Sequence, residues 1–158
     1  MTKGADNDGQ LKALLCFNVY ALNRSFGRFY QSAFSETGLT YPKFVILMAL
    51  KEEGPMSVST LSLRAGVEPN TLSPIVKKMA GFDLISRQRA NDDERRVELE
   101  ITAKGEAVLQ RAQEVVYEGF ASLNLEGNSL ADAIAFLETT REVVDDANPP
   151  KLNLDGIR

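Results

Sequence analysis

Hydrophobic residues near the start of the chain recur every three or four positions. From Gln10 to about Ser35 this spacing predicts one long helix with an apolar stripe along one face. The stripe consists of Leu11, Leu15, Val19, Leu22, Phe26, Phe29 and Ala33. The preceding residues 1–9 are polar and rich in Gly and Asp, which predicts a mobile segment.

Two shorter helical patterns follow. Thr40 has the residue type of an N-cap and Pro42 suits a first turn, so a nearly all-apolar helix is expected to begin there. It should end near Gly54 and lie at the centre of the fold, because almost all of its faces are apolar. Ser57 is expected to cap the next helix, which a turn at Gly66 ends.

A further helix is predicted from Pro69, a residue suited to the first helical position. Its apolar face consists of Leu72, Ile75, Val76 and Met79. Its opposite, polar face consists of Asn70, Thr71, Ser73, Lys77 and Lys78. Pro74 lies close to the helix start, where few backbone hydrogen bonds are lost, so we expect the helix to continue through it.

Between Leu84 and Thr102 a period of two replaces the helical period. Val97, Leu99 and Ile101 alternate with charged residues, which predicts a strand with one buried face. An arginine-rich arm before it completes a β-hairpin. The arginines of this hairpin are Arg87, Arg89, Arg95 and Arg96. Two helices joined by a Gly-containing turn and followed by a charged hairpin have the order of a winged helix-turn-helix, which predicts DNA binding.

Two more helices are predicted after the hairpin. Thr102 should cap the first, and Asn128 or Ser129 should open the second, which Pro149 and Pro150 end. Their apolar positions are Val108, Ala112 and Val115 in the first and Leu130, Ile134, Leu137 and Val144 in the second. The expected fold is mainly α with a small β-hairpin wing. It forms a single domain over residues 1–158, with residues 55–101 as its winged helix-turn-helix core.

The helices at the two chain ends hold more apolar surface than a small winged domain can bury alone. We therefore expect residues 10–36 and 103–147 to form a two-fold dimer. Such a dimer would place two recognition helices about 34 Å apart, which predicts an inverted-repeat operator. The alternative is that these helices only enlarge a protein that stays monomeric.

Composition and charge refine this picture. The chain is 44% hydrophobic and 25% charged, as is ordinary for a globular protein. The net charge is −4, yet residues 62–100 hold seven basic and seven acidic side chains, so the remainder has the whole negative charge. We expect modest nonspecific attraction to phosphate. Because no apolar run is long enough to span a bilayer, we expect a cytoplasmic protein without membrane contact.

DNA contacts are expected from the polar face of the helix that begins at Pro69 and from the hairpin. The predicted DNA-binding residues are Asn70, Thr71, Ser73, Lys77, Lys78, Arg87, Asp93 and Arg95. The short polar side chains suit base edges and nearby phosphates, and the lysines suit phosphates. Arg95 is the candidate for insertion into a minor groove, with Asp93 orienting it through a charge-assisted hydrogen bond. Alternatively, the run NDDERR is only a solvated turn.

Several of these segments together resemble a known family. From Leu39 to Gly105 the order LTYPKFVILMAL, VSTLSLRAGVEPNTLSPIVKKM and then a hairpin with DERRV and LEITAKG closely resembles the multiple-antibiotic-resistance regulator (MarR) family of bacterial repressors. The family's Asp-x-Arg wing signature matches Asp93 and Arg95. The resemblance implies a dimeric winged-helix protein that leaves DNA when a ligand binds or a cysteine is oxidised.

The chain has a single cysteine, Cys16, in the long first helix. Tyr20 should lie about 40° from it around the helix axis, on a face that also includes Tyr30. Cys16 and Tyr30 would be about 21 Å apart along a straight helix, so contact between them requires a second subunit or a bend. We expect Cys16 in the second turn, toward the helix amino terminus, which favours a thiolate. Alternatively, Cys16 is a small buried hydrophobe.

The segment LLCF, followed by Tyr20, Tyr30 and the Tyr41 of LTYP, resembles the organic hydroperoxide resistance regulator (OhrR) branch. The resemblance implies that Cys16 is redox-sensing and that the partner subunit's Tyr30 and Tyr41 form hydrogen bonds with it, with Tyr20 nearby. Since the sequence has one cysteine, the oxidised thiol would need a low-molecular-weight thiol to form a mixed disulfide, or would advance to irreversible acids.

These features favour a repressor released from an inverted-repeat operator when organic hydroperoxide oxidises Cys16. The peroxide would enter an apolar pocket at the dimer interface, lined by Phe17 and Phe44. The alternative is release by a small phenolic or aromatic-acid ligand without cysteine chemistry. An enzyme is disfavoured because the sequence has no histidine and no nucleophile paired with a base, and we expect no cofactor or metal. Asn18, a polar residue in an apolar segment, has no explanation from the sequence.

Overall fold

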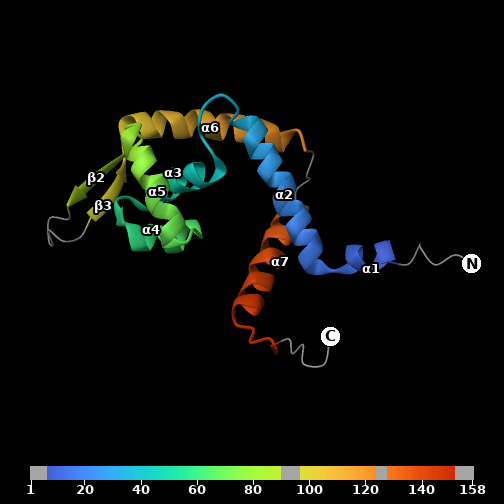
Figure 1. The fold of residues 1–158 in the computed structure, drawn as a ribbon. Coiled ribbons are helices and arrows are strands. Elements are labelled where there is room, and N and C mark those ends of the chain that lie inside the picture. The colour runs from blue at the N-terminus through green and yellow to red at the C-terminus, as the bar shows by residue number, and fades with distance from the viewer. Residues whose placement is uncertain (1–6, 90–96, 124–127, 152–158) are drawn as a thin grey trace, which may run out of the picture. The chain divides into compact units, whose positions relative to one another are not determined.

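The computed structural model describes residues 7–89, 97–123 and 128–151. The chain divides into two compact units, residues 1–119 and residues 120–158. Within the described ranges it forms seven helices and one three-stranded antiparallel sheet (Figure 1). This architecture confirms the predicted fold class, mainly α with a small β-hairpin, although the number of helices is larger than expected.

Helix α3, Tyr41–Glu53, forms the centre of the first unit, as its apolar sequence predicts. Ile46, Leu47 and Leu50 on this helix are at most 1% exposed. The side chains from other elements that are equally buried are Leu61, Leu72, Met79, Leu99 and Leu109. The prediction about capping was wrong in part: Thr40 occupies the N-cap position, but the described contacts of its side chain include no hydrogen bond to the helix.

The helix-turn-helix consists of α4, Val58–Ala65, and α5, Pro69–Gly81. Ser57 caps α4 as predicted, because its hydroxyl oxygen accepts a hydrogen bond from the amide of Thr60 at 3.1 Å. Gly66 ends α4 in the left-handed conformation, with φ of 61°, which glycine adopts without a Cβ clash. The second helix continues through Pro74, which confirms the prediction that no break occurs there.

The sheet has the strand order β1, β3, β2. Its strands are β1, Met56–Ser57, β2, Ile85–Arg89, and β3, Val97–Ile101. The hairpin of β2 and β3 was predicted, and its register places Ile85 opposite Ile101 and Arg87 opposite Leu99. Strand β1 was missed, because two residues are too few to show an alternating pattern.

Helix α6, Ala103–Ala121, begins at the base of the hairpin. The hydroxyl oxygen of Thr102 accepts a hydrogen bond from the amide of Gly105 at 3.0 Å, which confirms the predicted cap. A Cβ on Gly105 would lie 2.0 Å from the carbonyl oxygen of Leu84, so the close approach of α6 to the start of β2 requires glycine. Lys51 of α3 pairs with Glu106 at 2.6 Å and links α6 to the central helix.

The amino-terminal helix is broken, which corrects the prediction of one continuous helix over residues 10–36. Helix α1 spans Asn7–Ala13 and helix α2 spans Leu15–Ala33. Between them Leu14 is extended, with φ of −77° and ψ of 121°. The side-chain amide of Asn18 donates hydrogen bonds to the carbonyls of Lys12, at 2.8 Å, and Leu14, at 2.9 Å, and so bridges the joint. Helical structure also begins at Asn7, within the segment expected to be mobile.

Helix α2 is amphipathic, yet none of its residues, all of which the structure describes, is buried within the chain. Leu15, Val19 and Leu22 are 49%, 40% and 46% exposed. In the second unit, helix α7 spans Asn128–Asp145, so it begins at the predicted residue and ends before the two prolines. Its exposed apolar side chains include Leu130, Ile134, Leu137 and Val144. None of the helices in the described ranges combines the length and apolar character needed to span a bilayer.

Candidate nucleic-acid interface and sensor site

The polar face of α5 is the candidate surface for DNA. Leu72, Val76 and Met79 are buried on one side of the helix. The predicted contact residues Asn70, Thr71, Ser73, Lys77 and Lys78 are all exposed. Helix α5 therefore turns two ammonium groups and three short polar side chains toward solvent, the composition that suits a helix in a major groove.

Ser73 differs from its neighbours on this face, because its hydroxyl donates a hydrogen bond to the carbonyl of Pro69 at 3.0 Å. A phosphate oxygen can only accept hydrogen bonds, so Ser73 would have to break this bond to contact one. We therefore expect Asn70 and Thr71, which lie in the first turn of α5, to make more direct contacts than Ser73.

In the wing, Arg87 is exposed and lies opposite Leu99 in the ladder. Residues directly opposite each other in an antiparallel pair project from the same face of the sheet. Arg87 therefore shares the sheet face of Leu99, which packs into the core, and lies farther from the base of the hairpin than Ile85. Asp93 and Arg95 lie outside the described residues, so their predicted roles stay predictions.

Cys16 is exposed in the single chain. It is the second residue of α2, so the prediction that it lies in the second turn of a longer helix was wrong. The break at Leu14 is the reason, because it starts a new helix one residue before the thiol. The thiol consequently lies beside backbone amides that have no intrahelical acceptor.

Asn18 is the residue of this region that sequence analysis noted but could not explain. Its two hydrogen bonds hold the end of α1 to the start of α2, two residues from Cys16. The available signal was a carboxamide among apolar residues, which is typical of a side chain that completes the hydrogen bonding of an interrupted helix. Asn18 therefore positions the segment that contains the thiol.

Tyr30 on α2 and Tyr41 at the start of α3 lie together, with ring centroids 4.4 Å apart. Phe34 and Phe44 complete the aromatic cluster, each with its ring centroid within 6.1 Å of that of Tyr30. Burial raises the pKa of the Tyr30 hydroxyl above its ordinary value of 10.0, and the neighbouring Tyr41 raises it further. Tyr30 is therefore protonated at neutral pH and can donate a hydrogen bond.

The structure brings two of the four predicted redox residues together and leaves the other two apart. Because α2 is continuous from Leu15 to Ala33, Cys16 and Tyr30 are about 21 Å apart along its axis. Tyr20 lies one turn from Cys16, is 57% exposed, and stacks beneath the guanidinium of Arg24 at 5.8 Å. The expectation that Cys16 cannot reach Tyr30 within one helix is confirmed.

Phe17 and Phe44, which were expected to line one pocket at the dimer interface, have different surroundings within a single chain. Phe44 is 8% exposed and belongs to the core. Phe17 lines a small hollow on α2 with Tyr20. A separate cleft of about 550 Å³, here called the tyrosine cleft, is lined by residues that include Tyr30 and Tyr41. A pocket that joins Phe17 to Phe44 would need a second subunit.

Together, the amphipathic helix α5, its short connection to α4 and the following hairpin define a winged helix-turn-helix protein. The sequence family described as transcriptional regulator SarA/Rot matches residues 28–112, more than half of the chain. The chain belongs to the SarA/Rot family of transcriptional regulators.

Curated relatives agree with this assignment. The HTH-type transcriptional regulator TtmR of Methylorubrum extorquens (strain PA1) is 37% identical over 102 residues, which are 65% of this chain and 52% of TtmR. The HTH-type transcriptional regulator MgrA of Staphylococcus aureus is 36% identical over 99 residues, 62% of this chain and 67% of MgrA. The chain thus spans about half the length of TtmR and about two thirds of the length of MgrA.

Solved structures share the fold. The organohalide-sensing regulator RdhR in its 2,4-dichlorophenol-bound form superposes with a TM-score of 0.78 and 22% identity, covering 90% of this chain and 87% of that one. The repressor CouR, bound to a 23-mer DNA duplex, has a TM-score of 0.77 and 21% identity over 88% of this chain and 99% of its own. Overoxidized AbfR bound to DNA has a TM-score of 0.65 and 25% identity over 89% and 99%.

Proposed function

We propose that this chain is a dimeric repressor that leaves an inverted-repeat operator when organic hydroperoxide oxidises Cys16. The observation that most supports this function is the position of the thiol. It is exposed in the single chain, it lies in the first turn of α2, and the apolar side chains of Leu15 and Val19 beside it are 49% and 40% exposed. A thiol that lies outside the core of its own chain and near a helix amino terminus can react with an oxidant, whereas a cysteine packed into the core is inert.

Dimerisation is proposed through the helices of residues 10–36 and 103–147. The exposed apolar side chains of α2 and α7 support it, because contiguous apolar surface on a single chain is typical of an interface. A two-fold axis would set the two copies of α5 about 34 Å apart, which matches successive major grooves on one side of a duplex. The operator would then be an inverted repeat.

On each half-site we propose that α5 enters the major groove. Asn70 and Thr71 would face base edges, and Lys77 and Lys78 would face phosphates. Arg87, on the core-facing side of the wing, would add a phosphate contact. Asp93 and Arg95 at the hairpin tip stay the candidates for the minor groove. Residues 55–101 would thus form the DNA-binding core.

The dimer is also proposed to complete the sensor. Within one chain the pair of Tyr30 and Tyr41 is about 21 Å from Cys16, so the pair can reach the thiol only from another subunit. If the two copies of α2 run antiparallel, each Cys16 faces the partner subunit's Tyr30 and Tyr41. The protonated Tyr30 hydroxyl would donate a hydrogen bond to the thiolate, and Tyr20 would flank it.

The proposed chemistry has two steps. The Cys16 thiolate attacks the peroxide, the O–O bond breaks, and the products are a sulfenic acid on the protein and an alcohol. A low-molecular-weight thiol then replaces the hydroxyl of the sulfenic acid, forming a mixed disulfide and water. The added group does not fit a packed interface, so the subunits shift and the two copies of α5 no longer match successive grooves.

Fluorescence anisotropy on an inverted-repeat duplex from the chain's own promoter tests this function. Reduced wild type and Cys16→Ser should both bind, since serine keeps the size of the side chain. Stoichiometric cumene hydroperoxide with a small thiol should release the wild type and leave Cys16→Ser bound. Wild type that stays bound at complete oxidation, verified by mass spectrometry, would refute the redox mechanism.

The DNA half of the proposal has its own test. Lys77→Met keeps the apolar stem of the side chain but removes its charge, so it should weaken binding to all sequences and lower the salt dependence of log Kd by about 1. Lys51→Met, which removes a lysine of α3 that pairs with Glu106, is the matched control and should leave that dependence unchanged. If Lys77→Met and Lys51→Met had the same salt dependence of log Kd, DNA would bind to another surface of the protein.

A second candidate keeps the fold and changes the signal to a small phenolic or aromatic-acid ligand. The tyrosine cleft favours it, because it offers about 550 Å³ beside two phenol rings. RdhR, which shares the fold, was solved with 2,4-dichlorophenol bound. Release of Cys16→Ser from DNA by such a ligand, with wild type insensitive to peroxide, would favour this candidate.

A further inference from the structure

Helix α2 has a small hollow of about 230 Å³ on its surface. We call it the arginine hollow and define it by the residues that line it, which are Phe17, Tyr20, Ala21, Arg24, Ser25 and Arg28. All six belong to α2, a helix whose sequence includes two arginines and neither Asp nor Glu. The hollow is therefore a positively charged surface in a chain whose net charge is −4.

The two arginines of the hollow have no carboxylate partner among the described residues. The guanidinium of Arg24 lies over the ring of Tyr20, 5.8 Å from its centroid. Arg28 donates a hydrogen bond to the hydroxyl of Ser25 at 3.0 Å. A guanidinium has five N–H donors, so both groups keep donors for an anion that comes from outside the chain.

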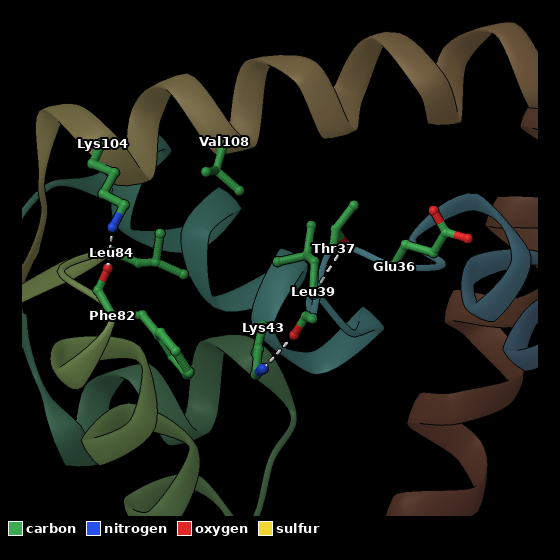
Figure 2. A pocket seen from close by; sticks show the side chains of 9 residues that line it. Glu36, Thr37, Leu39, Lys43, Phe82, Leu84, Lys104 and Val108 are labelled. Carbon is green, nitrogen blue, oxygen red and sulfur yellow. Dashed lines mark hydrogen bonds between the residues drawn. The ribbon is translucent and has the colours of Figure 1, made fainter.

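Several other cations of the first unit have acceptors of their own. In the cleft between the α2–α3 loop and α6, Figure 2 shows two lysines whose ammonium groups are bound to main-chain carbonyls. Lys43 donates to Gly38 at 2.5 Å, and Lys104 donates to Phe82 at 2.8 Å. The arginine hollow differs from these sites, because its strongest acceptors have to come from a ligand.

The arginine hollow and the apolar stripe of α2 lie on opposite sides of the helix. At 100° per residue, Arg24 and Arg28 are about 80° and 120° around the axis from Cys16. The stripe is centred about 90° from Cys16 in the other direction. A partner subunit that covers the stripe would therefore leave the hollow open, with the thiol at the border between the two faces.

The distances along α2 fit a small molecule that reaches from the hollow to the thiol. Cys16 and Tyr20 are about 6 Å apart along the helix axis, and Cys16 and Arg24 about 12 Å. Because the Arg24 guanidinium lies over the Tyr20 ring, it is drawn back toward the turn that contains the thiol. A ligand whose sulfur meets Cys16 can thus place an acidic group several ångströms away beside Arg24.

We propose that the arginine hollow binds the carboxylates of the low-molecular-weight thiol that forms the mixed disulfide with Cys16. This inference rests on the proposed redox function and names the class of thiol: one with carboxylates several ångströms from its sulfur. Arg24 and Arg28 donate charge-assisted hydrogen bonds to these carboxylates. The ligand sulfur attacks the sulfur of the sulfenic acid, an S–S bond replaces the S–O bond, and the hydroxyl leaves with the thiol proton as water.

Charge is what makes the hollow selective. A neutral thiol gains nothing from the two guanidinium groups, and a cationic thiol is repelled by them. The negative net charge of the chain repels anions in general, so the attraction of an anionic thiol is local to α2. The hollow therefore concentrates an anionic thiol beside the residue with which it reacts.

Binding can be tested apart from redox chemistry. The probe is S-methylglutathione, which has the two carboxylates of glutathione but no free thiol, added to full-length Cys16→Ser. We expect saturable shifts of the side-chain NMR signals of Arg24 and Arg28, and about tenfold weaker binding of the diethyl ester of the probe. Combining Arg24→Met with Arg28→Met should abolish this difference. Arg111→Met, which removes an exposed arginine of α6 outside the hollow, should preserve it.

The reaction is tested with wild-type protein after stoichiometric cumene hydroperoxide. Quenched mass spectrometry measures the rate of mixed-disulfide formation with glutathione and with its diethyl ester, at equal thiolate concentrations. Glutathione should react about tenfold faster, and high salt should reduce this advantage. Arg24→Met should lower the glutathione rate severalfold and leave the ester rate unchanged, whereas Arg24→Lys, which keeps the positive charge, should retain most of the advantage.

The outcomes separate this site from the redox function. Equal affinity for S-methylglutathione and its ester, equal rates for glutathione and its ester, or an undiminished preference in the double arginine variant would each overturn the proposal. Oxidation of Cys16 with no preference for the carboxylates would refute the hollow alone. A thiol that forms no sulfenic acid would refute the redox function, and with it the reaction proposed here, whatever the binding experiment shows.

Discussion

The segment from α3 to the wing and the helix α2 both contain many apolar residues, but the first buries them within the chain and the second leaves many of them exposed. Leu47, Leu61 and Leu99 come from two helices and a strand, and all three have 0% exposure. Leu15 and Leu22 on α2 stay 49% and 46% exposed. A regular apolar stripe therefore shows that a face requires cover, and it does not show whether the same chain provides that cover.

The two regions differ in the elements that surround their apolar side chains. The α3 side chains are surrounded by α4, α5, the sheet and α6, which close one core from several directions. Helix α2 contacts that core mainly near its carboxyl-terminal end, through Tyr30 and Ala33. Phe29 of the same stripe lies close to Gly119 of α6. Leu15, Val19 and Leu22 stay 49%, 40% and 46% exposed, which is why we propose a second subunit as their cover.

The largest expected effect separates the two regions by stability. Leu47→Ala should lower the free energy of unfolding by about 3 kcal/mol, because it leaves a cavity in a fully packed core. Leu22→Ala, an identical truncation on α2, should have a much smaller effect that disappears at low protein concentration. Urea unfolding at several protein concentrations measures both. An equal, concentration-independent loss in the two variants would mean that α2 is covered within its own chain.

A charge on α2 is expected to have the next largest effect. Leu22→Lys should weaken self-association by about tenfold to a hundredfold, because an unpaired ammonium would be buried between subunits. Its folding should be little changed, since position 22 is exposed in the single chain. Sedimentation velocity measures the association, and Leu63→Lys, at an 84% exposed position of α4, is the control. A dimer that tolerates Leu22→Lys would exclude this face of α2 from the interface.

Sequence patterns were sufficient for the central part of the fold. The caps at Ser57 and Thr102, the turn at Gly66 and the alternation around Leu99 depend on local chemistry, and the structure confirms each. Two features could not be predicted from the spacing of apolar residues. Strand β1 has only two residues, and the break at Leu14 interrupts a helix without interrupting the apolar spacing on either side of it.

The site was harder to predict than the fold, for a different reason. The exposed face of α5 follows from amphipathicity alone. A shared role for Tyr30 and Tyr41 was expected only through a family resemblance, and their contact within one chain was not predicted. The cleft between the α2–α3 loop and α6 could not be seen in the sequence, because two of its lining residues, Lys43 and Lys104, are 61 positions apart and line one cleft only in the folded chain. Sequence spacing shows which residues share an element, whereas clefts between elements depend on tertiary packing.

A smaller effect is expected at the α1–α2 joint. Asn18→Ala removes the two hydrogen bonds that bridge it and should destabilise α1 locally by about 1 kcal/mol. Faster amide hydrogen exchange over residues 7–18, with unchanged exchange in α3, would show this. Asn23→Ala, at an exposed position on the same helix, is the matched control. Unchanged exchange in Asn18→Ala would mean that the break at Leu14 does not depend on the carboxamide.

The smallest expected effect is a pH dependence from the aromatic cluster that joins α2 to the core. Burial, and then the proximity of Tyr41, raise the pKa of Tyr30 above 10.0, so the folded state holds this proton more tightly than the unfolded state does. Its contribution to stability is complete below about pH 10 and is lost as the pH rises through the folded-state value. Tyr30→Phe should therefore flatten the decline in unfolding free energy above pH 10, whereas Tyr117→Phe, at a 79% exposed position, should not. Urea unfolding between pH 8 and pH 11 measures the slopes, and an identical slope in Tyr30→Phe and wild type would show that the cluster does not hold α2 through this hydroxyl.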